Sequence, residues 1–150
     1  SSNANKYIKR WSSMEKVTIK YEQFHKSLKA FERALEIFKK EYPQADSDYK
    51  ETYVASVVKH YELLYETFWK YTKFYIIEKF GDDIIGSKNI FRFLQNANVI
   101  SLNELDLLLE IIENRNATTH QYDQDFSLQI VENIERYFQV IKSVTVKILL

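Results

Sequence analysis

The sequence predicts an all-α protein, an antiparallel up-and-down four-helix bundle with one additional short helix. The first observation behind this prediction is composition: the 150 residues include only two glycines and one proline, so residues that interrupt helices are rare. The second is that apolar residues recur at helical spacing in four long stretches. Because 45% of the residues are hydrophobic, a chain of this length can bury one core, and we expect a single helical domain.

The first two long helices should form a hairpin. The first is predicted over residues 24–42 and should end at Pro43, because proline has no backbone N–H to donate. Ser47 or Asp48 can cap the second helix, which is the longest, and Gly81 offers its C-terminal stop. The apolar stripe of the first helix is Phe24, Leu28, Phe31, Leu35, Phe38 and Tyr42, and that of the second is Val54, Val57, Val58, Tyr61, Leu64, Tyr65, Phe68, Tyr71, Tyr75 and Ile76.

Three more helices are predicted after the turn that follows Gly81. A short helix over about residues 88–96 precedes Ser101 and Glu104, whose spacing is that of a capping box at the start of the fourth helix. The last helix should begin at about Phe126, after the polar stretch 114–125. The expected core residues are Ile90, Phe91 and Leu94 in the short helix, Leu102, Leu105, Leu108, Leu109 and Ile112 in the fourth, and Leu128, Val131, Ile134, Tyr137, Phe138, Ile141 and Val144 in the last.

The remaining N-terminal residues carry less information. We interpret residues 1–4, Ser-Ser-Asn-Ala, as the remainder of an expression tag, because they are too polar for a signal peptide. The domain would then comprise residues 5–150, with a helical lead-in before Phe24.

Charge and rare residues exclude several kinds of function. Lys plus Arg equals Asp plus Glu at 21 each, so overall charge does not attract the protein to nucleic acid, and any RNA contact must be local. The absence of cysteine excludes disulfides and thiolate metal sites and fits a cytoplasmic location. His25 and His60 lie beside stripe residues and are expected to pack at helix flanks. We therefore expect no metal, no cofactor and no membrane-spanning segment.

Residues 113–123, with the sequence Glu-Asn-Arg-Asn-Ala-Thr-Thr-His-Gln-Tyr-Asp, combine the chain's rarest chemistry. Arg115 offers a planar cation for phosphate oxygens, and His120 can exchange protons near neutral pH. Tyr122 adds a hydroxyl. From composition alone, this stretch is equally typical of a solvated turn in which Arg and His interact with the end of a helix.

Helical geometry through this stretch would gather the polar groups on one rim. In a continuous helix, Arg115 and Thr119 share a face at a spacing of four residues, and so do Asn116 and His120. Asn116 and Thr119 are therefore expected to support Arg115 and His120.

The order Arg, four residues, His, one residue, Tyr resembles the signature of HEPN-type domains, the helical partners of minimal nucleotidyltransferases. Within them, the wording around Arg115 resembles most closely the nucleotidyltransferase substrate-binding family, and HepT toxins share its Arg, His and Tyr. A second stretch, residues 60–70, looks like the family's pattern of an aromatic residue and Glu followed by Glu-x-x-Trp-Lys. The resemblance extends from about Phe24 to the C-terminus. It departs from the family at Tyr61, where Phe is usual, and at Phe68, where a smaller residue precedes the Trp.

The second stretch allows two interpretations. Glu66 and Lys70 can form an ordinary ion pair within one helix, with Trp69 in the core. Alternatively, Glu66 reaches Arg115 or His120 from the neighbouring helix and fixes its orientation, with Trp69 and Lys70 as further supporting residues.

The resemblance implies two functions. The first is a binding subunit that packs against a separately encoded minimal nucleotidyltransferase in a toxin–antitoxin-like pair and presents a substrate, with nucleotide or RNA as the candidate ligands. The alternative is a metal-independent, HepT-like ribonuclease that cleaves RNA with Arg115 and His120 and is silenced by nucleotidylation of Tyr122. Both imply a homodimer. The catalytic pattern of a nucleotidyltransferase is absent, so we do not expect the chain to be the transferase itself. Whether it is an enzyme stays open. A purely structural helical module is a third interpretation.

Overall fold

The computed structural model describes the backbone of residues 2–119 and 124–150 and the side chains of residues 14–115 and 128–150. Five α-helices and one short 3-10 helix account for nearly all of these residues, and no strand occurs among them, which confirms the all-α prediction. The elements are α1 (Ser2–Glu41), η1 (Tyr42–Gln44), α2 (Ser47–Phe80), α3 (Ser87–Asn96), α4 (Leu102–Thr119) and α5 (Gln124–Thr145).

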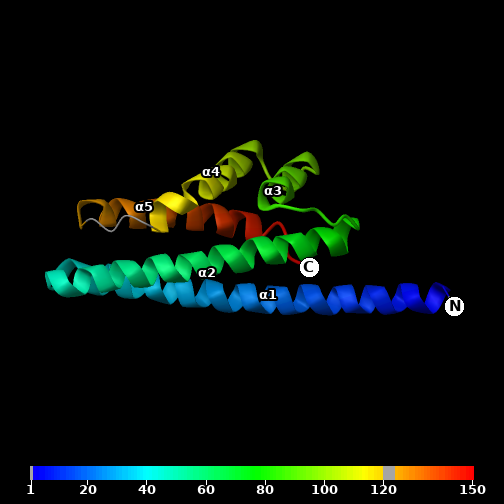
Figure 1. Ribbon diagram of the computed structural model, residues 1–150, viewed down its shortest axis with the longest axis horizontal. Helices are drawn as coiled ribbons and strands as arrows, with labels where there is room; N and C mark the ends of the chain where they lie inside the picture. The colour runs from blue at the N-terminus through cyan, green and yellow to red at the C-terminus, as the bar shows by residue number, and fades with distance from the viewer. Residues whose placement is uncertain (1, 120–123) are drawn as a thin grey trace.

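The helices form two layers (Figure 1). Helices α1 and α2 run antiparallel along their length, and α3, α4 and α5 lie over the other side of α2. The first part of α1 extends beyond the end of α2, and both chain termini lie toward this end of the molecule. The bundle is therefore uneven, because the α1–α2 hairpin is much longer than the helices that cover it.

Large aromatic side chains join the two layers. Phe31 of α1 is fully buried and contacts Phe138 of α5 at 4.7 Å between ring centroids. Phe24 of α1 packs edge-on against Phe68 of α2, which in turn packs against Phe91 of α3. Every residue of the stripe predicted for α2 is buried, so this helix is the central element of the core.

The ends of the helices test the predicted stop and cap signals. Gly81 ends α2 in a left-handed conformation with φ +77° and donates its N–H to the carbonyl of Ile77, as expected of a glycine stop. The capping box at the start of α4 is also confirmed. The N–H of Ser101 donates to Glu104 Oε1 at 2.9 Å, and the N–H of Glu104 donates to Ser101 Oγ at 3.1 Å.

Other details of the sequence prediction were wrong. Asp46, not Ser47 or Asp48, precedes the first turn of α2, and no side chain caps this turn. Leu102 and Leu128 are exposed at 62% and 51% rather than buried; Leu102 is the first residue of α4, and Leu128 lies in the first two turns of α5. The helical lead-in expected before Phe24 is confirmed, and it is continuous with the first predicted helix, because α1 begins at Ser2.

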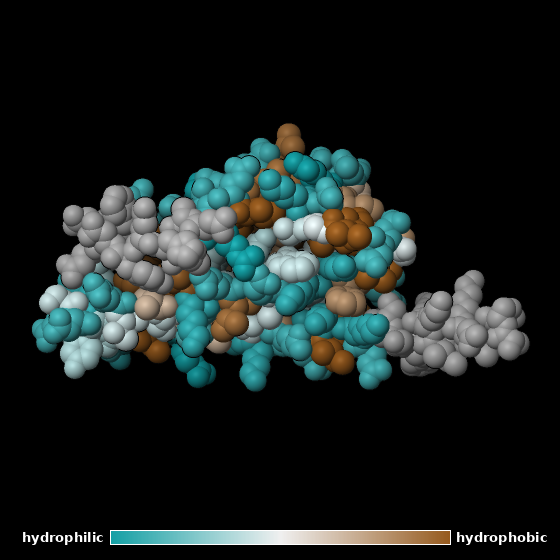
Figure 2. Space-filling model, in the orientation of Figure 1, coloured by the Kyte–Doolittle hydropathy of each residue, from teal (hydrophilic) through white to brown (hydrophobic). Residues whose placement is uncertain are grey.

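Polar side chains predominate on the coloured part of the face shown in Figure 2, with several smaller apolar areas between them. Exposed apolar residues near the junction of α2 and α3 include Phe80 and Ile85. No helix among the residues that the structure describes is sufficiently long and apolar to span a bilayer.

Candidate functional site

Arg115 is held between α4 and α2. Helix α4 continues through the first half of the polar motif to Thr119, so Arg115 lies in its last two turns and faces α2. The guanidinium donates through Nη2 to Oε1 of Glu66, and its central carbon lies 5.1 Å from the ring centroid of Tyr65. One side chain of α2 thus contacts an edge of the guanidinium, and its sequence neighbour contacts a face.

The other oxygen of the Glu66 carboxylate is held from within α2. The indole Nε1 of Trp69 donates to Glu66 Oε2 at 3.2 Å, and Lys70 Nζ lies 3.9 Å from the same oxygen. One carboxylate therefore joins Trp69, Lys70 and Arg115. Both interpretations of this stretch contribute: Glu66 pairs with Lys70 along the helix and also reaches Arg115 across the bundle.

The cluster is open to solvent on one side. The Arg115 side chain is 41% exposed, that of Glu66 is 31% exposed, and that of Lys70 is 48% exposed. Two positive charges and one negative charge leave these three side chains with a net charge of +1. A ligand can reach the cations, and its charge complement is an anionic group.

A network of tyrosines lies beneath Arg115. Tyr137 of α5 accepts a hydrogen bond from Asn114 Nδ2 at 2.9 Å, and its ring lies 6.4 Å from that of Tyr61. Burial is the main cause that raises the pKa of Tyr61 and of Tyr65, so both hydroxyls remain protonated at neutral pH. The sequence reasoning missed Tyr65, Asn114 and Tyr137, because their spacing looks like that of ordinary core and flank residues.

Several of the sequence-predicted site residues lie outside the described part of the chain. This applies to His120 and Tyr122 entirely, and to the side chains of Asn116 and Thr119, although the backbone of both is helical. The structure thus brings together Arg115, Glu66, Trp69 and Lys70 of the predicted set. Among the described residues, no group of His, Cys, Asp or Glu could hold a metal ion.

The other two histidines behave as flank residues. Nδ1 of His60 lies 2.7 Å from the carbonyl oxygen of Ser56, one turn earlier in α2. The ring of exposed His25 stacks on Tyr21 with 6.1 Å between centroids.

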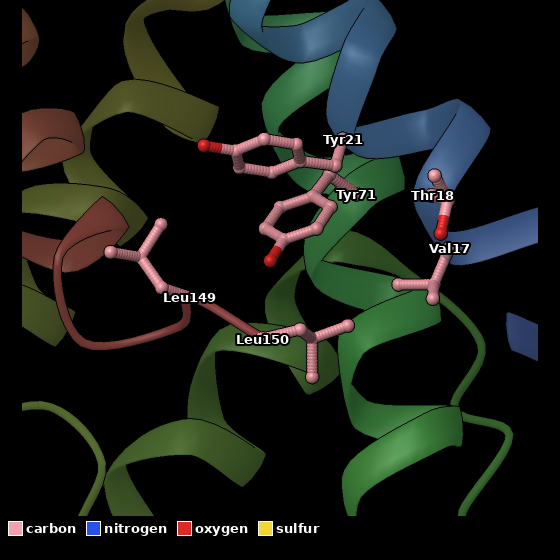
Figure 3. A pocket seen from close by; sticks show the side chains of 6 residues that line it. All are labelled: Val17, Thr18, Tyr21, Tyr71, Leu149 and Leu150. Atoms are coloured by element: carbon pink, nitrogen blue, oxygen red, sulfur yellow. The ribbon is translucent and has the colours of Figure 1, made fainter.

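A separate cavity of about 310 Å³ lies between α1, α2 and the C-terminal segment (Figure 3). The hydroxyl of Tyr71 points toward that segment and donates to the carbonyl of Ile148. No Lys, Arg, Asp or Glu side chain occurs among the six lining residues, so the cavity offers no charged side chain for phosphate, and no sequence-predicted site residue lines it. Its lining is Val17, Thr18, Tyr21, Tyr71, Leu149 and Leu150.

Comparison with known proteins identifies the class of protein. The family described as nucleotidyltransferase substrate binding protein like matches residues 19–148, so the chain belongs to this family. A crystal structure of a protein from Thermus thermophilus has a similar fold, with a TM-score of 0.62 and 22% sequence identity over 79% of this chain and 98% of the other. No curated protein matches the chain.

Proposed function

We propose that the chain is the helical substrate-binding subunit of a separately encoded minimal nucleotidyltransferase and that Arg115 binds a phosphate of the nucleotide. One observation carries this proposal: α2 holds the Arg115 guanidinium through Glu66 and Tyr65 while 41% of the side chain stays exposed. A guanidinium that is already oriented loses less side-chain entropy when it binds an oxyanion. Membership of the family supports the same function.

The resemblance in the motif extends the proposal to the assembly. We expect the subunit to act as a homodimer and, with its transferase, as one half of a toxin–antitoxin-like pair. The aromatic-rich composition, with 11 tyrosines and 10 phenylalanines, is compatible with protein contacts.

Two measurements test the proposal. Isothermal titration with ATP should give binding by the wild-type protein that becomes about tenfold or more weaker in Arg115→Ala, since a hydrogen bond to a charged group is lost. Size-exclusion chromatography with a purified minimal nucleotidyltransferase from the same genome should give a complex. The substrate-binding function would be refuted if wild type and Arg115→Ala bound ATP with equal affinity and no complex with the transferase formed.

Arg136 provides a matched control for Arg115. Its guanidinium also pairs with a carboxylate, Glu110 Oε1 at 3.0 Å, and lies over a tyrosine ring, that of Tyr137 at 5.3 Å. It is 51% exposed but lies on α5, outside the motif. Arg136→Ala should therefore leave ATP affinity unchanged, and an equal loss in both variants would indicate a nonspecific charge effect.

The second candidate function is a metal-independent ribonuclease. It is favoured by the same exposed Arg115, which lies five residues before His120 in the motif. In this reaction His120 would take the proton of the RNA 2′-hydroxyl, whose oxygen would form a bond to the adjacent phosphorus while the bond from phosphorus to the 5′-oxygen breaks. The proton would pass to the leaving 5′-oxygen, and Arg115 would stabilise the negative charge on the phosphorane oxygens. Labelled single-stranded RNA in EDTA should then yield 2′,3′-cyclic phosphate ends that disappear in His120→Ala. Intact RNA with the folded wild-type protein would exclude this candidate.

Modification of Tyr122 belongs to this second candidate. Incubation with the transferase and labelled ATP should label the wild-type protein but not Tyr122→Phe, which should still cleave RNA. Label that persists in Tyr122→Phe would assign the modification to another residue.

A further inference from the structure

We propose that Trp69 is a positioning residue that acts through Glu66, so that Arg115 and Lys70 are presented together to a single phosphate group of the nucleotide. The inference rests on the proposed function and identifies the ligand group at the same site. It starts from the fact that the two oxygens of the Glu66 carboxylate have different donors. Oε1 accepts from Arg115, whereas Oε2 accepts from Trp69 Nε1 and lies near Lys70 Nζ.

The indole N–H fixes the rotation of the Glu66 carboxylate. The Trp69 indole is rigid, half-buried and packed against the core, so its N–H is a directional donor with little freedom. With Oε2 fixed by this donor, the carboxylate cannot rotate without breaking a hydrogen bond, and Oε1 stays directed at α4. Arg115 is also limited by the ring of Tyr65, which lies beneath its guanidinium at 5.1 Å.

The charge of the cluster favours one phosphate group. Arg115, Lys70 and Glu66 together carry two positive charges and one negative charge, so these three side chains match the charge of one phosphate group. Lys70 and Arg115 pair with different oxygens of the same carboxylate, so Glu66 holds both cations at the junction of α2 and α4, where we place the phosphate. Lys70 is further held by the indole of Trp69, whose centroid lies 5.9 Å from Nζ.

The main experiment measures ATP affinity by isothermal titration in a double-mutant cycle. Trp69→Phe keeps an aromatic ring in the core but removes the N–H, and Arg115→Lys keeps the charge but removes the planar fork. We expect each single variant to bind ATP about threefold to tenfold more weakly than wild type. If Trp69 acts through Arg115, the double variant should bind no more weakly than Arg115→Lys alone.

The outcomes of this cycle separate the inference from the function on which it rests. If wild type binds ATP, Arg115→Ala does not, and Trp69→Phe binds like wild type, the positioning role of Trp69 is refuted and the binding function stands. Additive losses in the cycle would also refute it, because Trp69 would then act independently of Arg115. If wild type and Arg115→Ala bind ATP equally, the binding function itself fails.

Inorganic phosphate tests the ligand group directly. Inorganic phosphate should compete with ATP for binding to the wild-type protein. Lys70→Gln should weaken the binding of phosphate and the binding of ATP by a similar factor. ATP binding that phosphate does not affect would overturn the assignment of a phosphate group. Glu110→Gln, which removes the carboxylate of the comparable Arg136 pair, should have no effect.

A spectroscopic measurement covers the case in which Trp69→Phe fails to fold. The chain has two tryptophans, Trp11 and Trp69, so a ¹H–¹⁵N spectrum contains only two indole signals. Glu66→Gln replaces a charged acceptor with a neutral one, and the Trp69 indole proton should move upfield in it. The same signal should shift when ATP is added to wild type but not to Arg115→Ala. An indole signal that ATP leaves unchanged in wild type would contradict the coupling.

Discussion

Replacement of Glu104 by glutamine should remove much of the acid-sensitive part of the stability. Glu104 joins the start of α4 to the end of the chain: Lys147 Nζ donates to its Oε1 at 2.5 Å and Ser143 Oγ to its Oε2 at 2.7 Å. Burial alone would raise the pKa of Glu104, which is only 8% exposed, but hydrogen bonds from Lys147, Ser101 and Ser143 outweigh burial and lower the pKa from 4.5 to about 2. The folded state therefore favours the ionised carboxylate.

The sign and size of the effect follow from this pKa. Because the pKa of Glu104 is lower in the folded than in the unfolded state, its contribution to the free energy of unfolding is complete above pH 4.5 and is lost as the pH falls toward 2. The difference corresponds to about 3 kcal/mol at neutral pH and about 1 kcal/mol at pH 3. This is an upper value, because Lys147 is 42% exposed and solvent screens its charge.

Urea unfolding followed by circular dichroism at pH 7 and pH 3 measures this contribution. Glu104→Gln should lose about 2–3 kcal/mol at pH 7, a decrease in Tm of roughly 5–10 °C for a protein of this size, and less at pH 3. Glu110→Gln is the control, since Glu110 lies on the same helix but forms a surface pair, which should be worth less than about 1 kcal/mol. An equal loss of stability at both pH values in Glu104→Gln would show that Glu104 does not stabilise the fold through its ionised carboxylate.

Three further substitutions test the fold by thermal and urea unfolding. Gly81→Ala should lower the free energy of unfolding by about 1–2 kcal/mol, because alanine is strained at φ +77° even though nothing lies within 4 Å of the added Cβ. An unchanged Tm would contradict this strain at the end of α2. Phe31→Ala should lower the free energy of unfolding by about 3–5 kcal/mol, because the ring is fully buried. Ile37→Ala, at a position 46% exposed on the same helix, should lower it much less, and similar losses in the two variants would place Phe31 outside the core. Tyr137→Phe should lower the free energy of unfolding by about 1 kcal/mol, because the hydrogen bond from Asn114 is lost. Adding Asn114→Ala to this variant should lower it little further, and additive losses would exclude that hydrogen bond.

Local signals in the sequence were sufficient for most helix positions. The stripe of α2, the glycine at its end and the Ser101–Glu104 capping box depend on residues within a few positions of one another, and each matches the structure. The start of α4 shows the limit of this reasoning. Leu102 has helical spacing but is exposed, whereas Ile111, which was not assigned to the core, is only 1% exposed, because the rotation of α4 against its neighbours decides which face is covered.

The candidate site was predictable only in part for the same reason. The motif predicted that Arg115 belongs to the site, and helical spacing predicted that it shares a face with Thr119. The contacts of Arg115, however, come from a helix about fifty residues earlier in the chain. Glu66 was one of two interpretations, and the stacking on Tyr65 was not foreseen. Such contacts depend on how α2 and α4 cross, which periodicity within either helix does not specify.

The tyrosines of the core set an alkaline limit to the folded state. Burial is the main cause that raises the pKa of Tyr61, Tyr65, Tyr71 and Tyr75 above 10, to about 12 for Tyr71. Phenols that ionise more readily after unfolding draw the equilibrium toward the unfolded chain as the pH rises above 10. All four tyrosines lie on α2, which packs against α1 in one layer and against α3 and α5 in the other. Negative charge on these phenols would be placed between the two layers, so we expect alkaline unfolding to separate the layers in one transition.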